Sequence, residues 1–198
     1  MTIIAICGFQ SSGKDTIASY LVERLNFKKL SFAACLKDIV SIMFDWPRDK
    51  LEGLTKEDRK WREEVDEWWA TELNMPNLTP RYVLQYFGTE LFRVHWNQDI
   101  WLKVIEKKIN QYRNIVITDC RFPNEIEMLK KYNAKFIHIH RQMPSWFKSY
   151  QEGNDVEEAS KLHISEKEWI RTNPDFIINN DGTLDELYEN INNILVNL

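Results

Sequence analysis

A stretch near the N-terminus limits the folds open to this chain: residues 8–16 have the sequence Gly-Phe-Gln-Ser-Ser-Gly-Lys-Asp-Thr. An apolar run, residues 3–7, precedes it and is short enough for a buried strand, and residues 17–25 carry apolar side chains at helical spacing. The two glycines let the backbone turn its N–H groups inward, and the helix that follows directs the positive end of its dipole at an anion. Lys14 adds a positive charge for a polyphosphate. The stretch is therefore predicted to be a P-loop rather than a glycine turn with a chance lysine.

The loop departs from its commonest form at Asp15, which stands where a serine or threonine usually binds magnesium. A carboxylate beside phosphates is repelled unless a cation lies between them, so Asp15 favours a Mg²⁺ ion at this place. The sequence leaves open which of Asp15 and Thr16 contacts the metal, directly or through water.

Length and composition narrow the class of protein. A chain of 198 residues can fill one core with a small lid. With 26 basic and 30 acidic residues the net charge is -4, which favours a small anion over a nucleic acid polymer as partner. The three cysteines are far apart, as in proteins whose thiols stay reduced. Because no apolar run is long enough to span a bilayer and no signal peptide is visible, we expect a cytoplasmic protein.

Hydrophobic patterning predicts an alternation of strands and helices after the P-loop. Further strands are expected at 27–32, 114–118, 135–140 and 175–179. Helices are expected at 33–46, 81–96, 99–110, 122–132 and 184–198. This order predicts an α/β protein with a parallel five-stranded sheet flanked by helices, the P-loop NTPase fold. Ligands of such sheets bind at the carboxyl ends of the strands, so function is expected in the loops 8–16, 119–125, 141–163 and 179–183.

Two segments depart from this alternation. Residues 56–73 are heavily charged and are predicted to form one inserted helix, whose tryptophans pack it onto the domain. Residues 141–163 are polar and suit a mobile lid, with a slack surface loop as the alternative. We therefore expect a single kinase domain with a core of 1–50 and 110–198, a helical substrate-binding insert of about 51–109, and the lid.

Charged side chains beside the predicted strands indicate phosphoryl transfer. An apolar strand that ends at Asp119 resembles the Walker B arrangement, in which the carboxylate reaches magnesium or its water shell. Such a site must neutralise the phosphates of donor and acceptor, and four arginines stand at suitable loop and helix starts: Arg59, Arg81, Arg121 and Arg141. His138 and His140 share one face of a strand, where packed histidines are favoured over a metal pair.

Several blocks of the sequence together resemble the deoxynucleoside monophosphate kinases of bacteriophages and other large DNA viruses. The blocks keep their order, cover nearly the whole chain and lie at 8–16, 36–38, 84–91, 101–103, 119–125, 138–141, 163–166 and 179–184. The chain departs from the family at Gln10 and Ser11, where basic residues can stand, and its inserted segment is shorter than in some relatives. Base selectivity is therefore not carried over.

The resemblance implies a nucleoside monophosphate kinase fold and the ATP-dependent phosphorylation of a deoxynucleoside monophosphate to the diphosphate. It implies ATP-binding residues Ser11, Gly13, Lys14, Asp15, Thr16, Asn180, Asp181 and Gly182, with Mg²⁺ at Asp15 and Thr16. It implies monophosphate-binding residues Leu36, Lys37, Arg59, Arg81, Gly88, Thr89, Trp101, Asp119, Arg121 and Glu125. The catalytic residues would be Lys14, Asp119, Arg121 and Arg141.

Other interpretations remain at this stage. The Gly-Lys-Asp ending of the loop also resembles the phosphomevalonate kinases, which phosphorylate a phosphate that is not a nucleotide. A nucleotide-binding sensor is the alternative from a different class, although a sensor needs no arginines around an acceptor. Close helix packing would also explain Gly88, and a solvated helix face would explain Glu125. A homodimer is left open.

Overall fold

A computed structural model describes residues 1–162 and 164–196 of the chain. Contacts between Cα atoms divide the chain into two compact units, one of residues 1–31 and 106–198 and the other of residues 32–105. No helix in the described part of the chain has the length and apolar character needed to span a bilayer.

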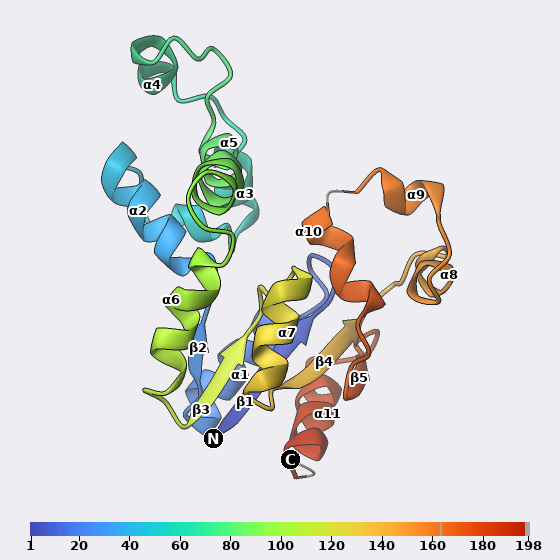
Figure 1. Cartoon of the computed structure of the whole chain (residues 1–198). Helices are drawn as coiled ribbons and strands as arrows, with labels where there is room; N and C mark the ends of the chain where they lie inside the picture. Colours follow the sequence, from blue (N-terminus) through green and yellow to red (C-terminus); the bar gives the residue numbers. More distant parts are fainter. Residues whose placement is uncertain (163, 197–198) are drawn as a thin grey trace. The chain divides into compact units, whose positions relative to one another are not determined.

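The first unit is built on a parallel sheet of five strands, which confirms the predicted fold class. The strands are β1 (Thr2–Cys7), β2 (Lys28–Leu30), β3 (Asn114–Ile117), β4 (Lys135–His140) and β5 (Phe176–Asn179), in the order β2-β3-β1-β4-β5. The strand that leads into the P-loop is therefore the central one, as Figure 1 shows. Its residues from Ile3 to Cys7 are buried, as expected for a strand covered on both faces.

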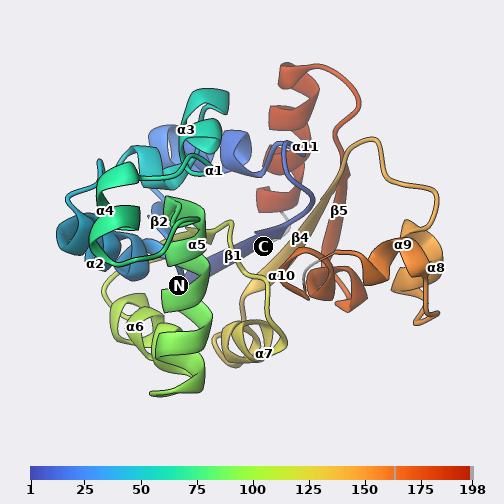
Figure 2. The same ribbon diagram turned by 90° about the horizontal axis from the view of Figure 1, so that it is seen from above.

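Three helices of the first unit cover the sheet. They are α1 (Lys14–Leu25), α7 (Pro123–Lys131) and α11 (Leu184–Val196). Figure 2 shows α1 and α11 on one face of the sheet and α7 on the other. The side chains of Ile4 and Ile6 pack with those of Leu21 and Ile191 in one buried cluster, which fixes α1 and α11 to β1. The last two residues of the helix predicted over 184–198 lie outside the described residues.

Short helices follow β4, the first two in the segment predicted to be a lid and the other two after it. They are α8 (Phe147–Gln151), α9 (Glu157–Ser160), α10 (Ile164–Lys167) and the 3₁₀ helix η3 (Glu168–Arg171). The ring of the fully buried His138 lies at 5.1 Å from that of Trp169, and the ring of His140 lies at 5.1 Å from that of Phe147. These contacts confirm that the two histidines are packed against aromatic side chains.

The second unit is helical. Its elements are α2 (Ala34–Phe44), η1 (Lys50–Glu52), α3 (Lys56–Trp61), α4 (Glu67–Glu72), α5 (Pro80–Gln85), η2 (Tyr86–Val94) and the start of α6 (Ile100–Ile109), which ends in the first unit. The single helix predicted over 56–73 is wrong, because the chain forms α3 and α4 with a break between them. Asp66 caps α4 by accepting a hydrogen bond from the backbone N–H of Trp69, and its other oxygen accepts one from the indole of Trp46.

The helix predicted over 81–96 forms, but only its first part is α-helical. It begins at Thr79, whose hydroxyl caps α5, but from Tyr86 to Val94 the turns are those of a π-helix. The backbone N–H of His95 bonds to the carbonyl of Glu90, five residues earlier. Apolar spacing predicts a helix here, but it does not determine whether an N–H bonds to the fourth or the fifth preceding carbonyl.

Candidate active site

The P-loop lies at the carboxyl end of β1, and its two glycines are required by close contacts. Gly13 caps α1 with φ 107° and ψ 5°, a backbone conformation that other residues rarely adopt. A Cβ atom on Gly13 would lie 2.5 Å from Nδ2 of Asn180, and one on Gly8 would lie 2.7 Å from the carbonyl oxygen of Ile139. The loop therefore packs too tightly against the ends of β4 and β5 for a side chain at either position.

The ammonium group of Lys14 lies across this loop. Its Nζ atom donates hydrogen bonds to the carbonyl oxygens of Gly8 at 2.8 Å and Phe9 at 2.6 Å. Burial lowers the pKa of Lys14; the negative charge of Asp15 opposes this shift and the positive charge of Arg121 adds to it. Arg121 follows β3, the strand paired with β1, so both cations lie at the same edge of the sheet, as expected where an anion binds between cations.

Asp15 already has a cation beside it. Its Oδ1 atom accepts a hydrogen bond from Nζ of Lys29 at 2.8 Å and a longer one from Oγ1 of Thr118 at 3.4 Å. Burial opposes ionisation of this carboxyl, but the contact with Lys29 prevails and lowers the pKa of Asp15. Neither Lys29 nor Thr118 was predicted from the sequence, although both lie near the carboxyl ends of the neighbouring strands β2 and β3.

Asp119 lies just after β3, where the sequence predicts a Walker B carboxylate. Its Oδ2 atom accepts a hydrogen bond from Oγ of Ser31 at 2.7 Å. Ser31 follows β2, the strand that pairs with β3, and sequence patterning did not single it out. The register of two adjacent parallel strands brings these side chains together.

Glu125 contacts the backbone of Arg121, and Glu166 contacts its side chain. The buried Oε2 atom of Glu125, a residue only 2% exposed, accepts hydrogen bonds from the backbone N–H groups of Arg121 at 2.8 Å and Phe122 at 3.1 Å. The alternative that Glu125 lies on a solvated helix face is therefore wrong. Nη1 of Arg121 lies 2.8 Å from Oε1 of Glu166, in α10. Glu166 stands in one of the blocks that carry the family resemblance, but no role was predicted for it.

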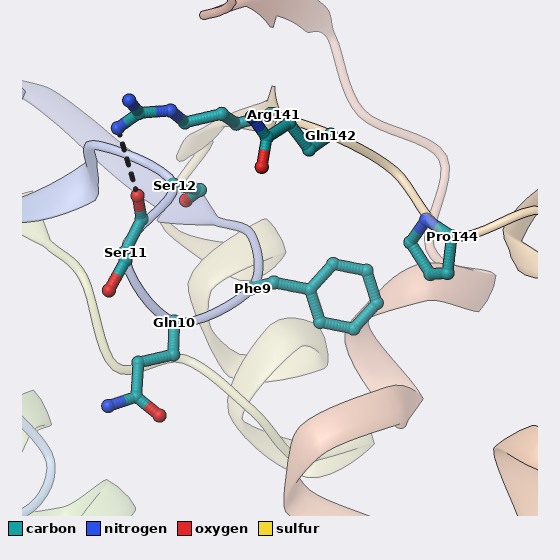
Figure 3. A pocket seen from close by; sticks show the side chains of 7 residues that line it. All are labelled: Phe9, Gln10, Ser11, Ser12, Arg141, Gln142 and Pro144. Carbon is teal, nitrogen blue, oxygen red and sulfur yellow. Dashed lines mark hydrogen bonds between the residues drawn. The ribbon is translucent and has the colours of Figure 1, made fainter.

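A cavity of about 440 Å³ lies between the P-loop and the chain that follows β4 (Figure 3). It is lined by Phe9, Gln10, Ser11, Ser12, Arg141, Gln142 and Pro144. Nη1 of Arg141 donates to the carbonyl oxygen of Ser11 at 3.4 Å. This volume lies in the range of small-molecule sites.

The loop after β5 closes on the same region. Nδ2 of Asn180 donates to the carbonyl oxygen of Ser12 at 2.7 Å, and the backbone N–H of Gln142 donates to Oδ1 of Asp181 at 3.0 Å. The fold thus brings together three of the four loops in which the sequence predicts function, namely those that begin at residues 8, 141 and 179. Gly182 and the half-buried Thr16 belong to the same loops, at 179–183 and 8–16.

Aromatic rings connect the P-loop to the predicted lid and to the 3₁₀ helix η3 that follows it. The ring of Phe9 lies 5.2 Å from that of Trp169 and 6.0 Å from those of Trp146 and Phe147, in edge-on geometry. Such pairs each add about 0.5–1.5 kcal/mol beyond burial alone. A movement of the P-loop is therefore expected to displace the segment that follows β4.

The remaining predicted residues lie in the second unit, and most have partners there. Nζ of Lys37 lies 2.5 Å from Oε2 of Glu52, Nε of Arg81 lies 3.2 Å from Oε1 of Glu63, and Nη1 of Arg59 donates to the carbonyl oxygen of Gly53 at 3.0 Å. The roles of these three cations at a substrate stay predictions.

Gly88 lies where helices of the second unit approach closely. A Cβ atom on Gly88 would lie 2.8 Å from Cδ2 of Leu36, and the indole of the buried Trp101 donates to the carbonyl oxygen of Gly88 at 2.9 Å. Thr89, the next residue, is half-buried. These contacts fit the packing interpretation of Gly88, and substrate contacts by Leu36, Thr89 and Trp101 stay predictions.

The central P-loop strand of a parallel sheet, with a half-buried lysine in the loop and an arginine after the adjacent strand β3, defines a P-loop kinase. A sequence model described as deoxynucleotide monophosphate kinase matches residues 55–191, more than half of the chain. The chain belongs to the deoxynucleotide monophosphate kinase family, as the sequence resemblance predicted, and is an ATP-dependent nucleotide kinase. This membership does not favour the phosphomevalonate kinase or the sensor.

Individual relatives are similar over different lengths. The putative deoxynucleotide monophosphate kinase of Acanthamoeba polyphaga mimivirus is 29% identical, and the alignment covers 96% of this chain and 94% of the viral one. The deoxynucleotide monophosphate kinase of Enterobacteria phage T4 is 28% identical over 58% of this chain and 44% of its own length. Among solved structures, the shikimate kinase of Aquifex aeolicus aligns over 99% of this chain and 97% of its own, with a TM-score of 0.49 and 18% identity.

Proposed function

We propose that this protein transfers the γ-phosphoryl group of ATP to a deoxynucleoside 5′-monophosphate, giving ADP and the deoxynucleoside diphosphate. The observation that carries the proposal is that Lys14 and Arg121 follow two adjacent parallel strands, β1 and β3, so that two cations stand at the same edge of the sheet to bind phosphates. Family membership and the names of the relatives support the choice of a deoxynucleotide as acceptor.

In this proposal the P-loop holds the donor. The backbone of Ser11 and Gly13 turns around the phosphates, and Lys14 exchanges its two carbonyl partners for phosphate oxygens. Arg141 and residues 180–182 are assigned to the part of ATP beyond the phosphates. The reason is that Arg141 and Asn180 contact the carbonyl oxygens of Ser11 and Ser12 in the P-loop. Residues 141–163 would close as the lid.

A Mg²⁺ ion fits the oxygen donors beside the loop. The side chain of Asp15 is 59% exposed and already accommodates a cation, the ammonium of Lys29, while Thr16 offers a hydroxyl one residue further on. Carboxylate, hydroxyl and phosphate oxygens are ligands that Mg²⁺ prefers. When bound, the ion would neutralise charge on the phosphates, and Asp15 with Thr16 would hold it directly or through water.

The acceptor requires positioning more than proton transfer. A monophosphate is largely a dianion at pH 7, so its oxygen attacks the γ-phosphorus while the bond to the bridging oxygen of ADP breaks. Arg121 is proposed to bind that dianion in bidentate fashion, exchanging Glu166 for phosphate oxygens. Glu125 would position Arg121 through its backbone, and Asp119, oriented by Ser31, would face the acceptor.

A coupled assay of ADP release tests the proposal. Purified protein with ATP and Mg²⁺ is offered each deoxynucleoside and ribonucleoside monophosphate in turn, with mevalonate phosphate as a comparison. We expect turnover with one or more deoxynucleotides and none with the Lys14→Ala variant. Turnover with mevalonate phosphate alone would replace the proposal with the phosphomevalonate kinase, and tight ATP binding without any acceptor would indicate a sensor.

A further inference from the structure

The proposed function gives Asp15 a role but assigns none to Lys29, its partner in an ion pair of the first unit. The Nζ atom of Lys29, in β2, lies 2.8 Å from Oδ1 of Asp15, and the two side chains are 40% and 59% exposed. Thr118 Oγ1 donates to the same oxygen at 3.4 Å. Asp15 therefore has one cation and one hydroxyl as partners within the chain.

The place that Lys29 takes is the one a metal ion would need. Asp15 directly follows Lys14 in the P-loop, so phosphates bound there would repel its carboxylate unless a cation screened them. An ammonium group has three donors and accepts nothing, so Lys29 cannot itself ligate a divalent ion, and its hydrogen bond occupies a lone pair of Oδ1 that the ion could otherwise use. At the short range of a 2.8 Å contact, two positive charges on one carboxylate oxygen also repel each other.

We propose that Lys29 is a positioning residue that occupies the cation place of Asp15 until Mg²⁺ arrives with the nucleotide, and that lysine and metal compete for this carboxylate. The inference rests on the proposed function only for its assumption that a metal–nucleotide complex binds at the P-loop. It assigns Lys29 two effects: the carboxylate is kept in place before the metal binds, and the affinity for the metal is held down.

The first effect follows from the 2.8 Å contact, which fixes the carboxylate toward Lys29. The second effect follows from the need to break that contact. Exposed ion pairs of this kind contribute little, so the competition should change metal affinity by about two- to fivefold rather than by orders of magnitude.

The adjacent lysine provides a matched control. Nζ of Lys28 lies 5.6 Å from the centroid of the Tyr112 ring, and Lys28 is an exposed residue of the same strand. Replacing Lys28 removes the same charge from the same strand without touching Asp15. A purely long-range effect of net charge would appear in both variants, whereas competition for Asp15 would appear only when Lys29 is replaced.

The experiment measures metal binding and not turnover. Mn²⁺, which takes the oxygen ligands of Mg²⁺, is titrated into the protein–ADP complex, and free Mn²⁺ is followed by electron paramagnetic resonance. We expect Lys29→Met to lower the half-saturating Mn²⁺ concentration about two- to fivefold. Lys29→Arg and Lys28→Met should stay near wild type, and thermal unfolding of each variant shows that the fold is kept.

A double-mutant cycle makes the test specific. In an Asp15→Asn background the Lys29→Met change should no longer affect Mn²⁺ binding, because the contested carboxylate is gone. An unchanged or raised half-saturating concentration in Lys29→Met would overturn the inference, and so would equal shifts in the two lysine variants or no Mn²⁺ binding to wild type with ADP. Since ADP needs no acceptor, failure of this inference is distinct from failure to phosphorylate a deoxynucleotide.

Discussion

At the scale of single residues, the charged groups of the candidate site have partners within the chain. Lys14 donates to two carbonyl oxygens of its own loop, Asp15 accepts from Lys29, and Arg121 pairs with Glu166. A ligand must therefore displace these internal partners in order to bind the same charged groups. Each of these contacts is expected to contribute a modest net free energy, since one hydrogen bond is lost for each one formed.

Arg121→Ala is expected to lower kcat/KM for the deoxynucleoside monophosphate by about 10- to 150-fold, which corresponds to about 1.5–3 kcal/mol for a lost charge-assisted hydrogen bond. Steady-state kinetics at saturating ATP measure this loss. Arg24→Ala, at an exposed arginine in the last turn of α1, serves as the control and should be neutral. Unchanged kinetics of Arg121→Ala with every monophosphate would contradict the proposed clamp.

Glu125→Ala should lower the free energy of unfolding by about 1–3 kcal/mol, because it leaves two backbone N–H groups at the start of α7 without their acceptor. Urea unfolding at pH 7 measures the loss. Glu127→Ala, at an exposed position of the same helix, should stay within about 0.5 kcal/mol of wild type. Equal effects of the two changes would show that the buried cap of Glu125 is not what stabilises this end of the helix.

At the scale of elements, the π-helix η2 is the largest departure from regular structure. Gly88 is its one buried residue, and α2 approaches it through Leu36 while α6 approaches through the indole of Trp101. π-helical turns are rare and occur often at functional sites, which agrees with the prediction that Gly88 and Thr89 lie near a substrate. In the second unit, however, the immediate role of Gly88 is to allow close packing.

Gly88→Ala is expected to destabilise the protein by about 1–3 kcal/mol, because the added methyl group overlaps Cδ2 of Leu36. Thermal and urea unfolding measure the change. Leu36→Ala costs stability by itself, but in the double variant part of the loss should be recovered, since the two changes relieve one overlap. Strict additivity of the two losses would mean that this contact is not the cause.

At the scale of the whole molecule, the sheet buries ionisable groups along with its apolar core. His138 is fully buried in β4, its Nε2 lies 3.1 Å from Oγ1 of Thr172, and its Nδ1 has no hydrogen-bond partner among the described residues. Burial, together with the nearby His140, lowers the pKa of His138 to about 4. Burial lowers the pKa of His140 as well.

Stability is therefore expected to fall as the pH falls from about 6.5 toward 4. In this window the unfolded chain binds a proton at His138 that the folded protein excludes, so acid favours unfolding by up to about 1.4 kcal/mol per pH unit. Above the unfolded pKa both states are neutral and the group has no effect. Urea unfolding at pH 5 and pH 7 should show a smaller difference in His138→Gln than in wild type, while His95→Gln, at an exposed histidine, should keep the wild-type difference. An unaltered difference in His138→Gln would rule out this residue as the source.

Local sequence patterns were sufficient to predict the framework of the first unit. The strand at Thr2–Cys7, the loop with Gly8 and Gly13, and the helix from Lys14 are each encoded within about twenty-five consecutive residues, so neighbouring side chains determine them. The parallel sheet follows from alternating strands and helices, and it brings the loops after β1, β4 and β5 together. The structure between Lys56 and Glu72 was not predicted correctly, because apolar spacing alone did not reveal that Asp66 caps a second helix there.

By itself the sequence determined the P-loop, the order of the strands along the chain and the candidate cations Lys14, Arg121 and Arg141, because motif and spacing are local properties. Only the tertiary structure decided which groups pair with the charged residues of the site. Lys29 pairs with Asp15, Ser31 with Asp119 and Glu166 with Arg121. These partners lie from 14 to 88 residues apart along the chain. Strand register and helix packing bring them within hydrogen-bonding distance, and neither can be derived from the residues that flank each one.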